Sequence, residues 1–287
     1  MAAMPDLELF ELSLLGGAAE RRYRRLRPEI AGLPWGTLDP DDFPKELVLA
    51  ARKSWTEAAF QEHRTGAACA VALRALIEAR APLDLIALAA WFPLDEIAHV
   101  ELCSRLATEL GGGAPLLHDP EGLAPKPLPG TRPLFRAADL VVRIFCVGEA
   151  ISIPLLHGTF RAATHPLVRG VLGRIVKDEA AHGEFGFMFL DWAADRLTRS
   201  DRRLLGEIAT ETIGALVGGW KGARPRQDLD SQAAAVHALG WMDTDAYFSL
   251  ARTSLKRCVL DRLHERGIPA QTFGMDCDGT GRIRDGR

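Results

Sequence analysis

Two short segments of the chain place a carboxylate and an imidazole three residues apart. Residues 94–103 read LDEIAHVELC and residues 177–186 read KDEAAHGEFG, so the pattern Asp-Glu-x-Ala-His-x-Glu occurs twice. On a helix, side chains at i and i+3 lie on the same face. Glu96 with His99, and Glu179 with His182, could therefore each hold one metal ion. A single Glu-x-x-His is a weak signal because chance supplies many, but a repeat of the longer pattern is more specific.

The neighbours of both pairs predict that they face the interior. Residues three, four or seven positions apart share a helical face, and around both pairs these positions are apolar or small. The neighbours of the first pair are Phe92, Val100, Cys103 and Leu106. Those of the second pair are Leu172, Ile175, Val176, Gly183, Gly186 and Phe189. Both carboxylate–imidazole pairs are therefore expected to be buried.

A third carboxylate stands alone in an apolar stretch. In LVVRIFCVGEAISIPLLHGTF, Glu149 is the only acid, and a buried carboxylate is costly unless it is paired or bound to a metal. Arg143 is the candidate for an ion pair, but it falls on a different helical face. A metal-bound Glu149 is the favoured interpretation, and a buried ion pair is the alternative.

The first long helix offers two further acids, and their neighbours separate them. Glu57 shares its face with Lys53, Ser54, Gln61 and Arg64, which is typical of a solvated surface. Glu62 is surrounded by a core stripe of apolar and small side chains, namely Trp55, Ala58, Ala59, Thr65, Gly66 and Cys69. Glu62 is therefore the favoured ligand.

One ordered set of residues on four successive helices results from these choices. Its members, predicted both as metal ligands and as catalytic residues, are Glu62, Glu96, His99, Glu149, Glu179 and His182. Six ligands with a carboxylate majority suit two divalent first-row metals, with iron first and manganese next. Cys69, Cys103 and Cys146 lie on the same stripes, but they are expected to fill the core because the ligand set is already complete.

Other side chains near this set are assigned more ordinary roles. The small residues beside the ligands either leave room for a substrate or let the helices pack closely. Thr65 and Ser152 are expected to bond back to their own helices. His157 is placed on the face of the third-helix glutamate, two turns on, and Glu101 and Glu184 are placed on solvated faces.

The elements that must position these residues are long helices. Ala- and Leu-rich stretches between proline and glycine clusters predict helices over 44–80, 82–110, 134–163 and 166–197. Pro93 lies inside the second helix, and a Pro/Gly-rich crossover without packed structure is expected at 112–133. A fifth helix, capped by Ser200 or Asp201, is expected to reach Gly219. At least one more is expected around 244–266, so the chain is predicted to be all-α.

The predicted domain organisation follows from these elements. Residues 1–42 form an N-terminal arm with a short helix, and residues 43–220 form a four-helix bundle with the metal site plus the fifth helix. Residues 221–268, with a polar break at 222–231, form a C-terminal helical extension. Residues 269–287 form a flexible tail.

At the ligand residues the chain resembles the ferritin-like di-iron carboxylate superfamily. In that superfamily two helices each supply a Glu and two others each supply a Glu-x-x-His. The resemblance covers about residues 44–197, and the segments GEAISIP and DEAAHGEFGFMFLDW resemble bacterial ferritin-like domain proteins. It implies a ferritin-like four-helix bundle with a long crossover and additional C-terminal helices.

The resemblance also implies a role for the Asp that precedes each motif Glu. In the related oxygenases and oxidases this Asp contacts the metal-bound His and not the metal itself. Asp95 would accept a hydrogen bond from His182, and Asp178 would accept one from His99, which would fix the tautomer of each imidazole and raise its basicity. The alternative for both Asp residues is a charge on the helix surface.

Individual branches of the superfamily differ in how well they match. Rubrerythrins carry paired Cys-x-x-Cys, which this sequence lacks. Radical subunits of ribonucleotide reductase place a Tyr where this chain has Cys103, whereas multicomponent monooxygenases tend to place a Cys there. Arylamine N-oxygenases add a His at the position of Ile175. Storage ferritins are shorter and lack the crossover and the C-terminal extension.

Three functional hypotheses remain open from the sequence. The first is a di-iron (Fe2+/Fe3+) oxidoreductase, a monooxygenase or oxidase that uses O2 on a small-molecule or carrier-bound substrate. Because the chain has no cofactor motif, its electrons would come from a separate reductase or ferredoxin. The second is a non-catalytic iron-handling protein with ferroxidase activity only, and the third is a buried polar network without metal. Manganese in one or both sites, the substrate and a homodimer stay open.

The overall composition limits which classes of partner and which cellular compartment are expected. The net charge of −3 and the scattered Lys and Arg residues give no reason to expect a nucleic-acid or membrane partner. The segment MAAMPDLELFELSLLGG is a poor signal peptide, and no uncharged apolar run approaches the roughly 20 residues that span a bilayer. Five widely spaced cysteines argue for a reducing cytoplasm and against a disulfide framework or a zinc ribbon.

Overall fold

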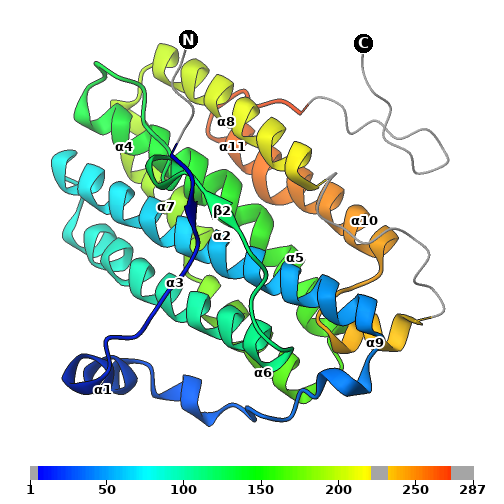
Figure 1. Cartoon of the computed structure of the whole chain (residues 1–287). Coiled ribbons are helices and arrows are strands. Elements are labelled where there is room, and N and C mark those ends of the chain that lie inside the picture. The colour runs from blue at the N-terminus through cyan, green and yellow to red at the C-terminus, as the bar shows by residue number, and fades with distance from the viewer. Residues whose placement is uncertain (1–5, 221–231, 273–287) are drawn as a thin grey trace.

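The computed structural model describes residues 6–220 and 232–272 (Figure 1). Within these ranges the regular secondary structure is helical apart from one pair of two-residue strands, so the predicted all-α class is confirmed. The strands are β1 (Glu8–Leu9) and β2 (Leu117–His118). The α-helices are α1 (Gly17–Leu26), α2 (Lys45–Glu78), α3 (Leu83–Glu109), α4 (Pro133–Val141), α5 (Ala150–Ala162), α6 (Pro166–Glu179), α7 (His182–Ala193), α8 (Arg199–Trp220), α9 (Ala233–Ala238), α10 (Thr244–Ser254) and α11 (Asp261–Glu265). Two π-helices are η4 (Val142–Glu149) and η7 (Leu255–Leu260), and the 3₁₀ turns are η1 (Pro28–Gly32), η2 (Pro40–Asp42), η3 (Pro120–Gly122) and η5 (Ala194–Arg196).

The first two long helices, α2 and α3, form a hairpin close to the predicted ranges. Each begins directly after a proline, Pro44 and Pro82, whose missing N–H is no loss at a helix start. The glycine run after α3 ends that helix. Gly111 and Gly112 adopt φ values of 102° and 111°, and their N–H groups donate to the carbonyls of Thr108 and Ala107. This pattern is a Schellman motif, which needs a left-handed residue that glycine supplies without strain.

The crossover between the two halves of the bundle is anchored at several points, contrary to the expectation of an unpacked linker. β2 pairs antiparallel with β1 from the N-terminal arm. The N–H of Leu128 donates to the buried carboxylate of Asp139 at 2.8 Å. The N–H of Ala114 donates to the hydroxyl of Thr56. The proline and glycine content correctly predicted that no long helix forms here, but it carries no information about such tertiary contacts.

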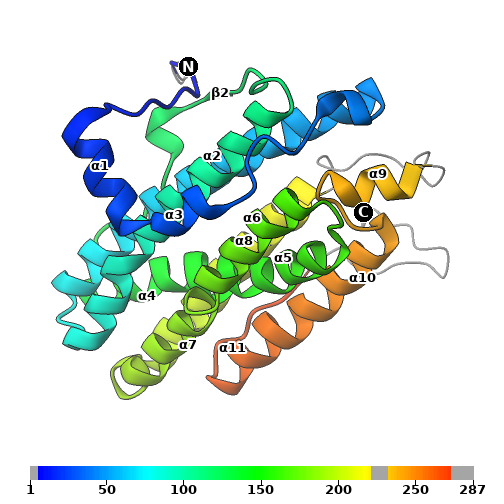
Figure 2. The ribbon, with the colours of Figure 1, turned by 90° about the horizontal axis from the view of Figure 1, so that it is seen from below.

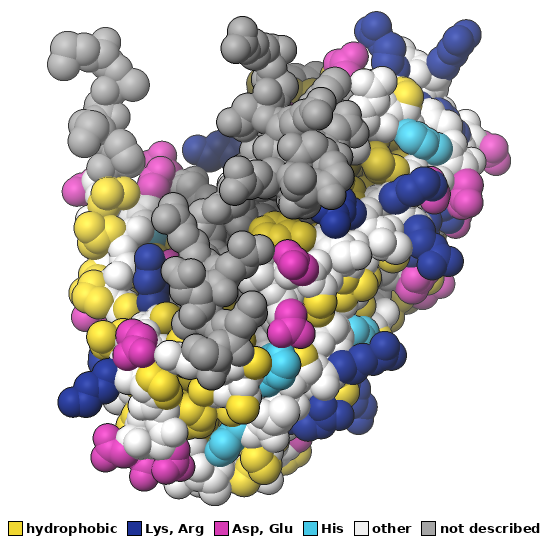
Figure 3. Space-filling model, turned by 90° about the vertical axis from the view of Figure 1, so that its right-hand side faces the viewer, with side chains coloured by type: hydrophobic (Ala, Val, Ile, Leu, Met, Phe, Trp, Pro, Cys, Tyr) yellow, Lys and Arg dark blue, Asp and Glu magenta, His cyan; other side chains and the backbone are white. Residues whose placement is uncertain are grey.

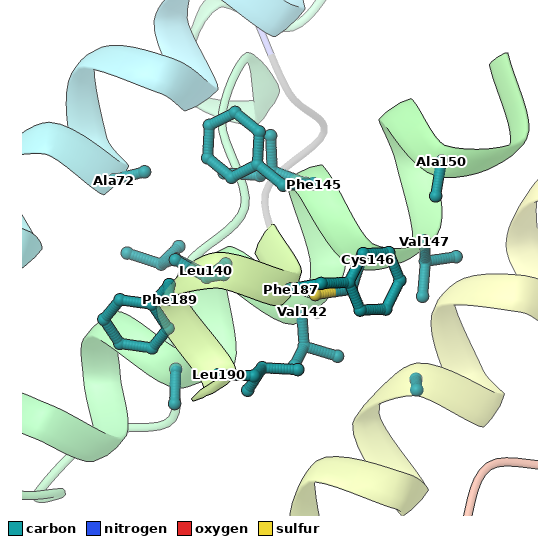
Figure 4. Packing of buried hydrophobic residues seen from close by; sticks show 14 of the residues in the cluster. Ala72, Leu140, Val142, Phe145, Cys146, Val147, Ala150, Phe187, Phe189 and Leu190 are labelled. Carbon is teal, nitrogen blue, oxygen red and sulfur yellow. The ribbon is translucent and has the colours of Figure 1, made fainter. Parts of the chain in front are cut away.

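The third predicted helix is interrupted by π turns. α4, η4 and α5 follow one another without a gap, but the hydrogen bonds of η4 span five residues instead of four, and Glu149 is its last residue. η4 packs against α7, and Figure 4 shows buried side chains of both elements in the same apolar cluster. The stretch Pro133–Ala162 is long and apolar enough to cross a membrane by length and composition, but 61% of its apolar window is buried, as in a core helix.

The fourth predicted helix is divided inside the second Asp-Glu-x-Ala-His motif. α6 ends at Glu179, and α7 begins at His182. Ala180 and Ala181 keep helical dihedral angles, so the hydrogen-bond ladder is interrupted while the backbone conformation stays helical. Both interruptions of the predicted helices therefore fall at predicted ligands, and π turns are frequent at functional sites.

The cap of the fifth helix differs from the prediction by two or three residues. Neither Ser200 nor Asp201 is the cap of α8. The hydroxyl of Thr198 accepts from the N–H of Asp201, and the Asp201 carboxylate accepts from the N–H of Thr198 at 2.8 Å. This reciprocal pair is a capping box with the acid at the third helical position.

The N-terminal arm and the C-terminal helices cover opposite sides of the bundle (Figure 2). The arm contains the expected short helix, α1, which lies beside α3 and is tied to it by an ion pair between Arg24 and Glu101. On the other side, α11 and the residue that follows it, Arg266, are held to α7 by two ion pairs, Arg262 with Glu184 and Arg266 with Asp191. The polar break predicted at 222–231 and most of the predicted tail lie outside the described residues. The predicted domain boundaries stay predictions.

The buried apolar residues form two clusters separated by a polar layer. One cluster contains Cys69, Phe92 and Phe185, and the other contains Ala59, Ala98 and Ile175. We call the successive helices α6 and α7 the α6–α7 rod. Along α2, α3 and this rod, the residues change from one cluster to the other at the positions of the predicted ligands. The core is thus built around a central polar site.

Candidate metal centre

The structure brings all six predicted ligands together. They form two groups of four, and in each group the potential ligand atoms lie within 4.8 Å of one another. One group is Glu62, Glu96, His99 and Glu179, and the other is Glu96, Glu149, Glu179 and His182. Glu96 and Glu179, the Glu residues of the repeated motif, belong to both groups. Two adjacent cation positions with two shared carboxylates can therefore be accommodated.

These side chains are buried almost completely. Glu96, His99 and His182 are fully inaccessible, and Glu179 is 2% exposed. The predicted neighbours of both motif pairs are buried as well, so that prediction is confirmed. Glu149 is 6% exposed. Glu62 is the most accessible of the six, with 18% of its side chain exposed, so the centre approaches solvent on the side of α2.

The imidazoles each direct Nδ1 toward carboxylates of both motifs. Nδ1 of His99 lies 3.2 Å from Oε1 of Glu179 and 3.7 Å from Oε2 of Glu96. Nδ1 of His182 lies 3.0 Å from Oε2 of Glu179 and 3.1 Å from Oε1 of Glu96. Glu62 Oε2 is 3.8 Å from Nδ1 of His99. The arrangement is nearly symmetric, because each motif Glu contacts its own His and the His of the other motif.

Although these atoms are close, they do not form hydrogen bonds of acceptable geometry. Both Nδ1 atoms, both carboxylate oxygens of Glu96 and Oε2 of Glu179 are buried without a hydrogen-bond partner. Each such buried polar group costs about 1–3 kcal/mol. These five orphaned atoms are distributed over the two groups of ligands. They fit a metal site, because cations at the two positions would satisfy all of them.

The electrostatics of the cluster also call for positive charge. Burial raises the pKa of Glu62 to about 8, with a further contribution from Glu96, although the contact with His99 acts in the opposite direction. Burial, followed by repulsion from Glu179, raises the pKa of Glu149 well above its usual value. Glu62 therefore holds a proton near neutral pH, and the shift at Glu149 favours its protonated form in the same direction. Bound cations would remove that need by neutralising the carboxylates directly.

The pKa values of the two imidazoles are also raised, but here the carboxylates and not burial are the cause. Burial acts to lower the pKa of both, but the neighbouring carboxylates outweigh it. Contacts with Asp95, Glu179 and Glu96 raise the pKa of His182 to about 12. The pKa of His99 is raised well above its usual value by Glu179, Glu62 and Glu96. The protonated imidazole of His182 thus supplies positive charge that the carboxylates attract, and the shift at His99 acts in the same direction.

The two Asp residues of the repeated motif make the expected contacts across the bundle. Nε2 of His182 lies 3.4 Å from Oδ2 of Asp95, and Nε2 of His99 lies 3.4 Å from Oδ2 of Asp178. Asp95 is 4% exposed, and the side chain of Asp178 is 7% exposed. The alternative of surface charges is therefore wrong for both. With Nε2 directed at Asp, each imidazole presents Nδ1 to the centre.

Comparison with models of known protein families and with curated proteins gave no match to this sequence.

An arginine that the sequence analysis did not single out holds these Asp residues. Arg27 is 3% exposed and forms ion pairs with Asp95 at 2.5 Å and with Asp178 at 2.7 Å. Arg174 forms a second ion pair with Asp178. Arg143, the candidate partner in the alternative of a buried ion pair for Glu149, instead donates to Asp139 at 2.7 Å.

Two assignments near the site are wrong. His157 is exposed, because eight residues rotate an α-helix about 80° away from the starting face. Glu101 is not a solvated charge, since its side chain is only 14% exposed and pairs with Arg24. The hydroxyls of Thr65 and Ser152 bond back to the carbonyls of Gln61 and Gly148, as predicted.

Proposed function

We propose that this chain is a ferritin-like di-iron oxidoreductase that activates O2 to oxidise or hydroxylate a small-molecule or carrier-bound substrate. The observation that carries the proposal is the pair of overlapping four-residue groups with Glu96 and Glu179 in common. Two bound irons would supply the binding and reduction of O2. Iron is preferred because a mixed carboxylate and imidazole set suits it, and manganese in one or both positions is the alternative.

The chain's own residues would divide the work at such a centre. Glu96 and Glu179 would be shared between the two cations, and Glu62 and Glu149 would each bind one of them. His99 and His182 would each bind through Nδ1, while Asp178 and Asp95 hold their Nε2 protons. Burial of five of the six side chains would limit the access of water to the reacting atoms. Electrons would come from an external donor.

The assignment to the ferritin-like superfamily is part of this proposal. Its support is the order of the ligands along the chain and the helices that carry them. α2 supplies one Glu, α3 a Glu-x-x-His, the α4–η4–α5 rod one Glu, and the α6–α7 rod the second Glu-x-x-His. This order is the pattern of di-iron bundles of that superfamily.

A second candidate is an iron-handling protein with ferroxidase activity only, and the packing of the glycines near the site favours it. A Cβ at Gly183 would lie 2.5 Å from Cδ1 of Ile153, and one at Gly66 would lie 3.2 Å from Cβ of Glu96. At these two positions the glycines let the helices pack closely, which is the alternative to room for a substrate. A centre that admits only O2 and metal ions would need no more space.

Metal content per chain after iron-supplemented expression is the decisive measurement, with an optical spectrum as the reduced protein meets O2. We expect about two irons per wild-type chain and an oxygen-dependent absorption change. Glu62→Ala and Glu149→Ala should each lose metal. Glu57→Ala is the matched control, since Glu57 lies on the same helix as Glu62 with 43% of its side chain exposed.

The possible outcomes separate the candidates. Background metal in the wild type would leave only a buried polar network. Equal metal in the Glu57 and Glu62 variants would remove Glu62 from the set of ligands. Two irons with O2 consumption that stops when the Fe2+ is exhausted would support the ferroxidase. Sustained turnover with a chemical reductant and a product from an added substrate would support the oxidoreductase.

A further inference from the structure

Arg27 belongs to the N-terminal arm in sequence and to the bundle interior in space. It lies between α1 and η1, within a basic segment that reads RRYRRLRP. Arg21, Arg22 and Arg25 of that segment are exposed, whereas the Arg27 side chain is only 4% exposed. A buried guanidinium is retained only where its charge and its donors are matched.

The contacts of Arg27 connect both halves of the repeated motif. Nη1 donates to Oδ1 of Asp95 and Nη2 donates to Oδ2 of Asp178. The other oxygen of Asp95 lies against Nε2 of His182, and Oδ2 of Asp178 lies against Nε2 of His99. One planar guanidinium therefore reaches both imidazoles through one carboxylate each. A guanidinium has fixed, diverging donors that suit this task, which a single ammonium group does not.

We propose that Arg27 is a positioning residue that orients both imidazoles of the proposed metal centre at once, so that docking of the N-terminal arm is a condition for loading both metal positions. The part of this inference that concerns metal loading rests on the proposed function. Arg27 touches none of the six ligands directly in the contacts described above, and it acts through Asp95 and Asp178. If either Asp rotated away, its imidazole would lose the contact that holds Nδ1 toward the centre.

Arg174 provides an internal comparison. It donates Nε to Oδ2 of Asp178 at 2.8 Å, so it supports the contact to His99 alone. Loss of Arg174 should disturb one imidazole, and loss of Arg27 should disturb both. A merely structural ion pair would change the free energy of unfolding without producing this difference between the two histidines.

The test uses the full chain and four variants: Arg27→Gln, Arg27→Lys, Arg174→Gln and, as a matched control from the same segment, Arg25→Gln. The first readout needs no metal and follows solvent exchange of the two imidazole Nε2 protons by NMR. We expect both protons to exchange faster in Arg27→Gln, only that of His99 in Arg174→Gln, and neither in Arg25→Gln. Arg27→Lys keeps the charge and tests the fork geometry if the Gln variant folds poorly, and it should still fail to protect both protons.

The second readout is the affinity for Co2+, followed by its visible absorption. Loss of such supporting contacts typically lowers metal affinity about 10- to 100-fold, and we expect a loss of this size at both positions in Arg27→Gln. Unchanged proton exchange and unchanged Co2+ affinity in folded Arg27→Gln and Arg27→Lys would overturn the inference. A wild type that binds no Co2+ would instead contradict the proposed function. In that case the proton exchange still decides whether Arg27 orients the imidazoles. The claim that docking of the N-terminal arm is required for metal loading would then be wrong.

Discussion

The residues of the two Asp-Glu-x-Ala-His motifs explain each other once they are seen in space. Asp95 contacts the His of the second motif, and Asp178 contacts the His of the first. Glu96 and Glu179 likewise approach both imidazoles. Each motif is therefore incomplete alone, and the duplication supplies the two halves of one nearly symmetric site.

Metal uptake by these residues should release protons and strengthen as the pH rises. In the metal-free protein Glu62 has a pKa of about 8, His182 one of about 12, and the pKa of Glu149 is raised well above its usual value. Glu62 and His182 hold protons at neutral pH, and the shift at Glu149 favours its protonated form, whereas a metal binds the deprotonated forms. Proton competition therefore weakens binding at low pH and declines as the pH passes through the pKa of Glu62.

This prediction is measured as Co2+ affinity between about pH 6 and about pH 9, together with proton release in weakly buffered solution. Glu62→Gln is the matched variant, because its amide carries no titrating proton. It should bind more weakly at every pH and lose the part of the slope that lies near the pKa of Glu62. Affinity that is independent of pH, or proton uptake on binding, would contradict the assigned protonation states.

Residue-level prediction from the sequence succeeded where helical periodicity carried the information. The six candidate ligands share apolar faces, and all six meet in the structure. Arg27 was missed because the arm contains several arginines with no apolar periodicity to show which is buried. Its partners, Asp95 and Asp178, are also distant in sequence, and only tertiary contact identifies the pairing.

At the scale of elements, proline and glycine located helix ends well, but breaks within helices were not predictable. The start of α2 after Pro44 and the end of α3 before Gly111 follow from local backbone chemistry. In the π segment η4 and at the break between α6 and α7, the hydrogen-bond pattern of the backbone changes although the chain continues in a helical conformation. Residue types in 142–149 and 180–181 are compatible with an ordinary α-helix, so tertiary packing and the polar site decide the register.

The close packing of α7 against η4 should be sensitive to a single methyl group. A Cβ at Gly186 would lie 2.7 Å from Sγ and 2.9 Å from the backbone N of Cys146, so the backbone would have to shift. We expect Gly186→Ala to lower the free energy of unfolding by about 1–3 kcal/mol, as overpacked cores do. Urea unfolding measures the change.

Gly214→Ala in α8 is the matched control. A Cβ there would meet nothing within 4 Å, and the residue is exposed. Replacing an unstrained helical glycine should raise stability by about 0.4–1 kcal/mol. If both substitutions stabilise the protein equally, the tight contact between α7 and η4 does not exist in solution.

At the scale of the whole molecule, the polar layer is the point where all four long helical rods meet. The two apolar clusters on either side of it give the bundle its cohesion, while the N-terminal arm and α10–α11 close its sides. The face shown in Figure 3 carries charges of both signs among apolar side chains. Buried ionisable side chains are concentrated instead, since four Glu, two Asp and Arg27 lie close together in the layer.

Because the proposed ligands come from every rod, metal binding should stabilise the whole bundle rather than one segment. A ligand that binds only the folded state adds about 2.7 kcal/mol when its free concentration is about 100 times its Kd. For a domain of this size that corresponds to a rise in Tm of about 5–10 °C for each occupied site. Calorimetry with and without Co2+ measures the rise, and a chelator should reverse it. The metal-induced rise should be kept in Glu57→Ala and reduced in Glu149→Ala, whereas equal rises in both variants would place the bound metal elsewhere on the protein.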